Sequence, residues 1–276
     1  MKNLFKRSIF GTLFLVVIIA SLLCPYSYAA MSLFILVSAS VEFFRLLEPG
    51  RRFVKEKVSV ILASAAFFVL SFCHFQFGMD SRFIACSFIP IIAVYIFMLH
   101  DCSSDYFFDG TLFMPLIYIG LPMVSTLLLS YPEGNFNGMM ILGILILIWC
   151  NDVGAYCFGT AFGQKEHSRK LAPRISPKKS WIGVAGGTLC TMAAAFILAK
   201  TGFALQIGLV HWLAVGLIVS SVGVCGDLFE SLIKRHTGVK DSGNIIPGHG
   251  GILDRFDDIL LLMPLIAVYL KLFSLI

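Results

Sequence analysis

The densest group of chemically active side chains lies in one polar segment between two apolar runs. This segment, residues 226–258, reads GDLFESLIKRHTGVKDSGNIIPGHGGILDRFDD and contains five aspartates, one glutamate and four lysine or arginine residues. Carboxylates that bind Mg²⁺ beside cationic side chains are typical of phosphoryl and nucleotidyl transfer, because the metal and the cations neutralise phosphate oxygens. The segment therefore predicts a site that handles phosphates. The alternative is a solvated loop with incidental ion pairs beside lipid headgroups.

The first half of this segment has the spacing of a helix that continues out of an apolar run. Asp227 is followed by Glu230, Ser231 and Lys234. Residues three, four and seven positions apart share one helical face. This face would present two carboxylates, a hydroxyl and an ammonium group at the membrane surface.

The second half combines a turn with the start of another helix. A proline and three glycines between residues 247 and 251 exclude a helix interior. They favour a tight turn whose backbone N–H groups can approach an anion. Asp254, Asp257 and Asp258 follow with helical spacing, and Arg255 lies beside them. Carboxylates at a helix N-terminus are stabilised by its dipole and can hold a hard divalent cation.

The whole chain has the composition of an integral membrane protein. Its 276 residues are 58% hydrophobic and 13% charged, with a mean hydropathy of +0.89, whereas soluble domains have about 45–50% apolar and about 25% charged residues. The excess apolar surface must face lipid, which excludes a soluble globular protein, a disordered chain, a coiled coil and a secreted disulfide scaffold. The eight cysteines contain no C-x-x-C pair, so no metal site or disulfide framework is expected from them.

Nine apolar runs predict membrane-spanning helices, so we expect an all-α integral membrane protein with about nine spans. A span needs about 20 mostly apolar residues. Lysine and arginine precede the first run, so a cleaved signal peptide is the alternative there. The nine runs are residues 8–24, 30–47, 58–75, 83–99, 112–130, 138–158, 182–199, 205–225 and 257–275.

The positions of lysine and arginine predict the orientation of these spans. With a cytoplasmic N-terminus and the C-terminus outside, 18 lysine and arginine residues lie in inner segments and three lie outside. This asymmetry agrees with the positive-inside rule. The compactness of the chain suggests a bacterial inner membrane.

The polar loops predict how the chain is divided. Residues 1–135 would hold about five helices, and residues 136–276 would form a catalytic region. This second region has two long cytoplasmic loops, residues 160–181 and 226–256, which concentrate the polar side chains. We therefore expect an active site that faces the cytoplasm and is built from the last four helices and their inner loops.

The polar segment resembles the signature of the phosphatidate cytidylyltransferase (CDP-diacylglycerol synthase) family. Three stretches support the resemblance: residues 151–156 (NDVGAY), 175–180 (ISPKKS) and 226–231 (GDLFES). It covers the C-terminal half firmly, and the first 140 residues only in their general pattern of spans. The positions that match the signature are Ser231, Ile233, Lys234, Arg235, Lys240, Asp241, Gly243, Pro247, His249, Gly250, Gly251, Asp254, Arg255, Phe256 and Asp257.

The resemblance implies a reaction and a metal. CTP and phosphatidate would be the substrates, and CDP-diacylglycerol and pyrophosphate the products, with membrane lipid but no nucleic acid as a partner. Asp227 and Asp254 are the expected metal ligands, with Asp257 and Asp258 as second candidates. The implied cofactor is Mg²⁺, with a second cation such as K⁺ as an option. A homodimer is consistent with the resemblance.

The resemblance and the chemistry together assign roles to the other polar residues. Lysines and arginines would neutralise the triphosphate and the lipid phosphate, and arginine suits bidentate capture. His249 either donates to a phosphate or braces the turn, and Asp152 either serves the substrate site or makes a local hydrogen bond between helices. The expected catalytic residues are Asp227, Ser231, Lys234, Arg235, Lys240, Asp241, His249, Asp254, Arg255 and Asp257. The expected substrate-binding residues are Asn151, Asp152, Ser176, Lys178 and Lys179.

Three other functions fit part of the sequence. A CTP-dependent polyprenol or phytol kinase would transfer the terminal phosphate of CTP, but the complete signature favours the cytidylyltransferase. A transporter would carry charges near mid-span on several helices, whereas here the charges gather at the inner surface. A non-catalytic lipid-binding scaffold would not need carboxylates at metal-ligand spacing.

Overall fold

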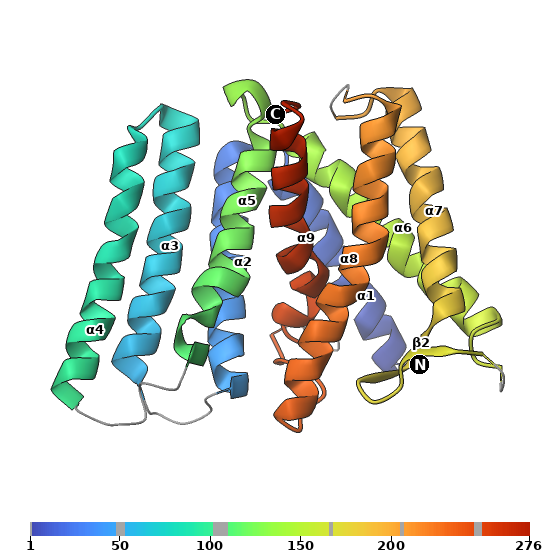
Figure 1. The fold of residues 1–276 in the computed structure, drawn as a ribbon, viewed down its shortest axis with the longest axis horizontal. Helices are drawn as coiled ribbons and strands as arrows, with labels where there is room; N and C mark the ends of the chain where they lie inside the picture. The colour runs from blue at the N-terminus through green and yellow to red at the C-terminus, as the bar shows by residue number, and fades with distance from the viewer. Residues whose placement is uncertain (1, 48–52, 102–109, 166–167, 205–206, 246–249) are drawn as a thin grey trace. The chain divides into compact units, whose positions relative to one another are not determined.

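Each of the nine apolar runs coincides with a helical segment in the computed structural model of the chain (Figure 1). The structure describes the chain except for residues 1, 48–52, 102–109, 166–167, 205–206 and 246–249. Within this part of the chain, seven helical segments are long and apolar enough to cross a membrane. The prediction of a mostly helical membrane protein is therefore confirmed.

Two of the nine runs do not meet the same criterion. In α1 (Lys2–Ser21) the described apolar part, Phe10–Ser21, is shorter than a span requires. In α9 (Leu253–Leu272) the first turns carry several charged residues. The count of nine spans thus stays a prediction.

The helices divide into two compact units. The first unit consists of Met1–Phe136 and Asp241–Phe256, and the second consists of Asn137–Lys240 and Asp257–Ile276. The segment Asp241–Phe256 therefore packs within the first unit, although it lies near the C-terminal end of the sequence.

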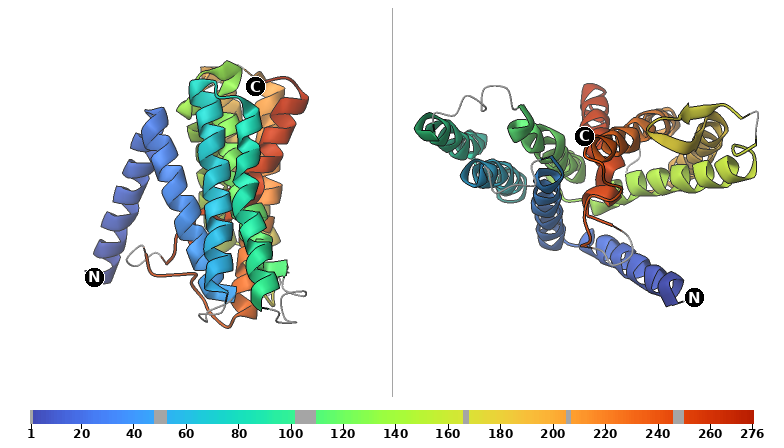
Figure 2. Two further views of the ribbon diagram at one scale, coloured as in Figure 1. Left: turned by 90° about the vertical axis from the view of Figure 1, so that its left-hand side faces the viewer. Right: turned by 90° about the horizontal axis from the view of Figure 1, so that it is seen from below.

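The first unit is organised around α3, which contacts α2, α4 and α5. The helices α3 and α4 run side by side in each view (Figures 1 and 2). Gly78, with φ of 67°, ends α3 in the left-handed conformation that glycine adopts readily. The elements of this unit, besides α1 and the start of α9, are α2 (Pro25–Leu47), α3 (Val54–Phe77), η1 (Ser81–Phe88), α4 (Ile89–Asp101), η3 (Gly110–Phe113), η4 (Leu116–Gly120), α5 (Leu121–Ser130) and η5 (Pro132–Gly134).

The second unit contains α7, which packs against both α6 and α8, and a short antiparallel hairpin that precedes α7 (Figure 1). The hairpin pairs Lys170 with Ser180 and Ala172 with Ser176. It is a departure from the expected all-α fold, and it lies in the polar loop between two spans. The elements are α6 (Gly138–Ala161), β1 (Lys170–Ala172), β2 (Ser176–Ser180), α7 (Trp181–Thr201), α8 (Leu209–His236) and the rest of α9.

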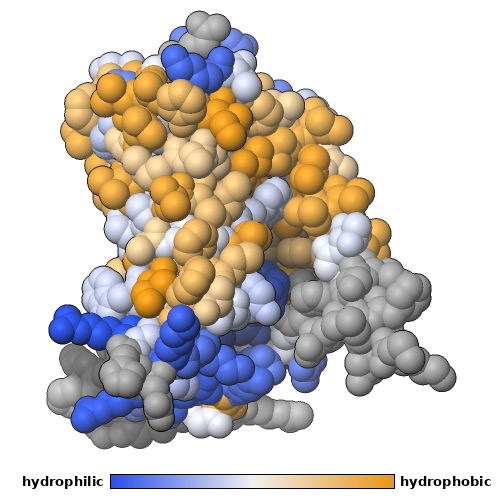
Figure 3. Space-filling model, turned by 90° about the vertical axis from the view of Figure 1, so that its right-hand side faces the viewer, coloured by the Kyte–Doolittle hydropathy of each residue, from blue (hydrophilic) through white to orange (hydrophobic). Residues whose placement is uncertain are grey.

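The apolar side chains of this unit cover its outer surface as well as its core. On α7, Leu189 and Ile197 are more than half exposed, which is expected of a helix that faces lipid. Figure 3 shows hydrophobic side chains over the middle of this face and hydrophilic ones at both ends, with the larger hydrophilic group at the lower end. The end with the larger hydrophilic group is where residues that handle a soluble nucleotide are expected.

Glycines allow α6 and α7 to approach each other closely. A Cβ at Gly154 would lie 2.8 Å from Sγ of Cys190, and one at Gly187 would lie 2.6 Å from Oδ1 of Asn151. A Cβ at Gly186 would overlap the Cβ of Phe158. Small residues at such contacts let two membrane helices pack through their backbones.

Gly186→Ala is expected to destabilise the protein by about 1–3 kcal/mol, because the added methyl group must displace Phe158 or separate the two helices. Thermal unfolding in detergent micelles, followed by tryptophan fluorescence, measures the effect. Gly110→Ala is the control, since a Cβ there meets no described atom within 4 Å. Equal unfolding midpoints for the two variants would contradict the close packing of α6 on α7.

Candidate active site

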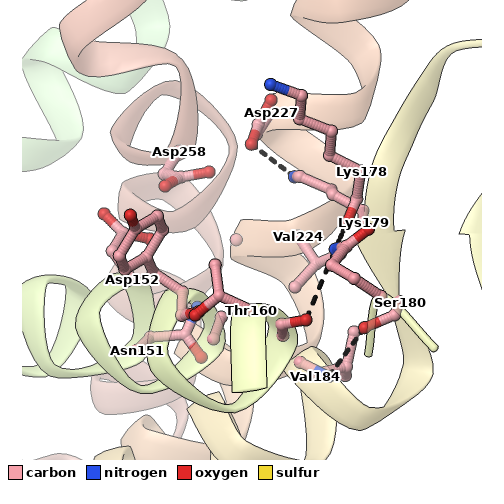
Figure 4. Close-up of a pocket in the computed structure, with 16 residues that line it drawn as sticks. Asn151, Asp152, Thr160, Lys178, Lys179, Ser180, Val184, Val224, Asp227 and Asp258 are labelled. Atoms are coloured by element: carbon pink, nitrogen blue, oxygen red, sulfur yellow. Dashed lines mark hydrogen bonds and ion pairs between the residues drawn. The ribbon is translucent and has the colours of Figure 1, made fainter. Parts of the chain in front are cut away.

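The second unit encloses a cavity of about 660 Å³ at the polar side of its helices. Its walls come from α6, the turn after α6, β2, α7, α8 and α9, and Figure 4 shows polar side chains from several of these elements directed into it. The polar lining consists of Asn151, Asp152, Tyr156, Thr160, Gln164, Lys178, Lys179, Ser180, Asp227 and Asp258.

Three aspartates from three different helices line this cavity. Asp152 comes from α6, Asp227 from α8 and Asp258 from α9, and their carboxylates are directed into the same space (Figure 4). Asp258 interacts electrostatically with both of the others and with its neighbour Asp257. Helices that are far apart in sequence thus place several carboxyl groups together.

Two lysines from β2 face this group of carboxylates. Lys179 forms an ion pair with Asp227, and Lys178 lies exposed at the cavity wall. The Gln164 side chain donates to the carbonyl oxygen of Lys178 (2.9 Å) and accepts from the ammonium group of Lys170 (2.7 Å). These hydrogen bonds attach the hairpin to the turn after α6, so the lysines are held at the cavity.

Ser180 joins the hairpin to α7. Its hydroxyl accepts a hydrogen bond from the backbone N–H of Gly183 (3.2 Å), and its side chain is buried. Serine is a favoured N-cap because it satisfies an N–H group that has no partner within the helix. Ser180 is therefore both the last residue of β2 and the residue that caps the start of α7.

Two buried oxygens in the cavity wall lack a hydrogen-bond partner within the described part of the chain. They are Oδ1 of Asn151 and Oδ1 of Asp258. Carboxylate oxygens are ligands that Mg²⁺ accepts, so Oδ1 of Asp258 suits a hard cation or a donor of a bound substrate, whereas Oδ1 of Asn151 lies against Gly187 of α7. Among the described residues, no three His, Cys, Asp or Glu side chains are arranged to enclose a metal ion, and Asp227 is engaged by Lys179.

The four polar residues predicted on one face of α8 are on that helix, but Glu230 is buried and is not presented at the surface. The helix runs without interruption to His236, Ser231 donates to Oδ1 of Asp227 (3.2 Å), and Lys234 forms a 2.5 Å ion pair with the buried Glu230. Arg235 is exposed and donates through Nε to the carbonyl oxygen of Ile175, at the hairpin (3.3 Å). Ser176, which begins β2, is half-buried, and Lys240 is exposed after α8.

Other predicted site residues belong to the first unit. Both carboxylate oxygens of Asp254 accept from the backbone N–H of Ser242 (2.9 and 3.1 Å), and one also accepts from that of Gly251 (2.8 Å). Asp241 and Arg255 are exposed. His249 lies outside the described residues. Asp227 and Asp254 lie in different units, so a metal ion shared by these two aspartates stays a prediction.

Several residues of this architecture were not anticipated from the sequence. Gln164 is one of them, because its role depends on a hairpin that hydropathy does not indicate. Tyr156, to which the sequence analysis assigned no role, is exposed and lines the cavity. Glu42 is buried in α2, and an ionisable residue inside an apolar run is a signal that could have identified it.

Comparison with known proteins gives consistent matches. A family model described as the cytidylyltransferase family matches residues 5–273. Three relatives are named phosphatidate cytidylyltransferase. The protein of Pseudomonas aeruginosa is 43% identical over 154 residues (56% of this chain, 55% of the relative). That of Bacillus subtilis is 40% identical over 173 residues (62% of each). That of Haemophilus influenzae is 39% identical over 143 residues (50% of this chain, 48% of the relative). The matched part of the chain thus spans about half the length of these relatives, and somewhat more in Bacillus subtilis.

Asp258→Asn is expected to stabilise the protein by on the order of 1 kcal/mol in the absence of divalent cations, because it removes a poorly compensated charge at constant shape. It is also expected to weaken any stabilisation by added MgCl₂. Unfolding midpoints in EDTA and in MgCl₂ measure both effects.

Asp80→Asn is the control for this prediction. The Asp80 carboxylate is hydrogen-bonded by Arg82, so its loss is expected to be neutral or destabilising. If Asp258→Asn in EDTA unfolds below the wild type, the interpretation of Asp258 as an uncompensated charge is wrong.

Proposed function

The chain belongs to the cytidylyltransferase family, and we propose that it transfers the cytidylyl group of CTP to phosphatidate, which yields CDP-diacylglycerol and pyrophosphate. The observation that carries the proposal is the cavity in which aspartates from three helices face two lysines of the hairpin. Several relatives named phosphatidate cytidylyltransferase support the choice of substrates.

The proposed reaction is a displacement at the α-phosphorus of CTP. An oxygen of the phosphatidate phosphate forms the new bond, the bond to the oxygen between the α- and β-phosphorus breaks, and pyrophosphate leaves with its electron pair. A phosphate monoester has a second pKa of about 6, so the attacking oxygen is already ionised and needs no general base. The protein then has to position the two substrates and balance their charge.

The cationic side chains are proposed to take different parts of this task. Lys178 and Lys179 reach the cavity from β2 as compact charges that neutralise phosphate oxygens. Arg235 and Arg255 offer planar guanidinium groups that can bind a phosphate through two parallel hydrogen bonds. Binding of substrate phosphates at Lys179 would release Asp227 from its ion pair.

We also propose Mg²⁺ as the cofactor, held by Asp227 and Asp254, with Asp257 and Asp258 as further candidate ligands. When bound, the ion would neutralise negative charge on the phosphates during the transfer. The unpartnered oxygen of Asp258 supports a cation in this part of the cavity. A second cation such as K⁺ and a homodimeric assembly are expectations that follow from the family resemblance.

The proposed membrane topology has nine spans, a cytoplasmic N-terminus and an external C-terminus, with the active site on the cytoplasmic side of a bacterial inner membrane. The distribution of lysine and arginine supports this orientation, because 18 of them lie in the segments assigned to the inside and three lie outside. CTP is a soluble cytoplasmic nucleotide, which agrees with a site on that side.

The function is tested with purified protein in detergent, phosphatidate, Mg²⁺ and CTP labelled at either the α- or the γ-phosphate. We expect label from the α-position in the lipid product and release of pyrophosphate. Transfer of the γ-label to a polyprenol offered in the same reaction would instead identify a kinase. If neither label reaches lipid while the protein is folded, the proposed function is wrong.

Asp227→Asn is expected to lower kcat by about 100-fold or more, because a charged group that stabilises the reacting phosphates is lost. Initial rates of pyrophosphate release measure the effect. Asp80→Asn is the matched control, since it also neutralises an aspartate that pairs with a cationic side chain but lies in the other unit. A lipid-binding scaffold without catalysis would show no difference between these variants.

A further inference from the structure

A single buried carboxylate of the N-terminal helices contacts the segment that carries the family signature. Glu42 lies on α2 and is 1% exposed. Its oxygens accept hydrogen bonds from the hydroxyl of Ser242 (3.1 Å) and from the backbone N–H groups of Ile252 (3.0 Å) and Leu253 (2.9 Å). About 200 residues separate the donors from the acceptor in the sequence. The signature segment is therefore held by a residue that does not belong to it.

The two backbone donors belong to the start of α9. Leu253 is the first residue of that helix, and Ile252 directly precedes it. The first N–H groups of a helix have no partner within the helix, and the positive end of its dipole favours an anion. Glu42 thus caps α9 from another helix. Among the described residues no cationic side chain pairs with Glu42, so these hydrogen bonds compensate its charge.

The signature glycines fit around this carboxylate. A Cβ at Gly243 would lie 2.5 Å from Oε1 of Glu42, and a Cβ at Gly251 would overlap Oε2. Neither position could hold a larger residue while Glu42 keeps its place. The requirement for glycine at position 243 therefore follows from the Glu42 carboxylate, and at position 251 it follows from Glu42 together with the Ser242 hydroxyl group that Glu42 binds.

Asp254 completes the attachment on the other side of the segment. It accepts from the backbone N–H groups of Ser242 and Gly251, each of which also lies beside Glu42. Two carboxylates, Glu42 and Asp254, therefore hold the chain at Ser242 and at residues 251–253. An Asp254 that is already held by two N–H groups has a defined orientation, which a metal ligand or phosphate-handling residue needs.

We propose that Glu42 is a positioning residue for the signature segment: it fixes Ser242 and residues 251–253 at the start of α9, and thereby the orientation of Asp254 and Arg255. The inference rests on the proposed function for its catalytic consequence. It assigns to an N-terminal helix a part of the active-site framework. Glu42 itself contacts the backbone and one serine, so it acts through the residues that it holds.

Glu42→Gln tests this inference because it keeps the shape of the side chain. An amide has one acceptor oxygen, and its NH₂ group would face the N–H of Ile252 or Leu253, so at least one hydrogen bond is lost. We expect kcat to fall by about 10- to 100-fold, since small misplacements of active-site groups have effects of this size. The KM for CTP is expected to change much less.

Hydrogen exchange provides a readout that does not depend on activity. In Glu42→Gln, peptides that contain Ile252 and Leu253 are expected to exchange at least tenfold faster, while those from α3 and α5 are unchanged. Ser242→Ala removes one of the three hydrogen bonds and is expected to shift both readouts in the same direction by less. This milder variant keeps the test decisive if Glu42→Gln does not fold.

Ser40→Ala is the control on the same helix. Ser40 is also fully buried, but its hydroxyl donates to Leu36 within α2. We expect wild-type kcat and exchange for this variant. Unchanged exchange near residue 252 in both Glu42→Gln and Ser242→Ala would overturn the inference, as would a uniform loss of protection throughout the protein. A wild type without cytidylyl transfer would overturn the proposed function, whereas the exchange result would still decide whether Glu42 anchors the segment.

Discussion

The structure depends on how an apolar chain compensates its few buried carboxylates. An unpaired charge removed from water costs on the order of several kcal/mol, so each such group needs a specific partner. Glu230 is paired with Lys234, and Glu42 is surrounded by N–H groups of a helix start. Asp258 differs, because within the described residues it has neither an ion pair nor a hydrogen-bond partner for one of its buried oxygens. Glu42 and Glu230 thus have N–H or ammonium partners within the protein, whereas Asp258 keeps an oxygen without such a partner in the cavity wall.

The same cavity depends on the close approach of two helices. Gly186 and Gly187 let α7 lie directly against α6, and Gly187 adjoins the side chain of Asn151 in the cavity wall. The hairpin is short and connects these two helices, so their separation determines where Lys178 and Lys179 can reach. Backbone packing between membrane helices therefore sets the distance between the cationic and the anionic sides of the site.

The sequence predicted the helices and much of the polar chemistry, because both are local. Hydropathy identified each apolar run, and helical spacing predicted that Asp227 and Ser231 would share a face. The hairpin and the role of Gln164 were missed, since they depend on hydrogen bonds between segments with no apolar periodicity. Glu42 was missed for a related reason, because its donors are about 200 residues away and two of them are backbone groups that no motif records.

The contact of Glu42 also changes how the N-terminal helices are understood. The family resemblance was only general over the first 140 residues, so their one expected role was to span the membrane. A carboxylate on α2 that needs small residues at Gly243 and Gly251 gives these helices a second role, because it shapes the segment whose spacing defines the signature. A glycine in a motif can therefore be required because another atom occupies the place of a Cβ, and not only because the backbone there must be flexible. Here that neighbour is one glutamate on a helix that the motif does not include, so the signature describes only part of the structure that it requires.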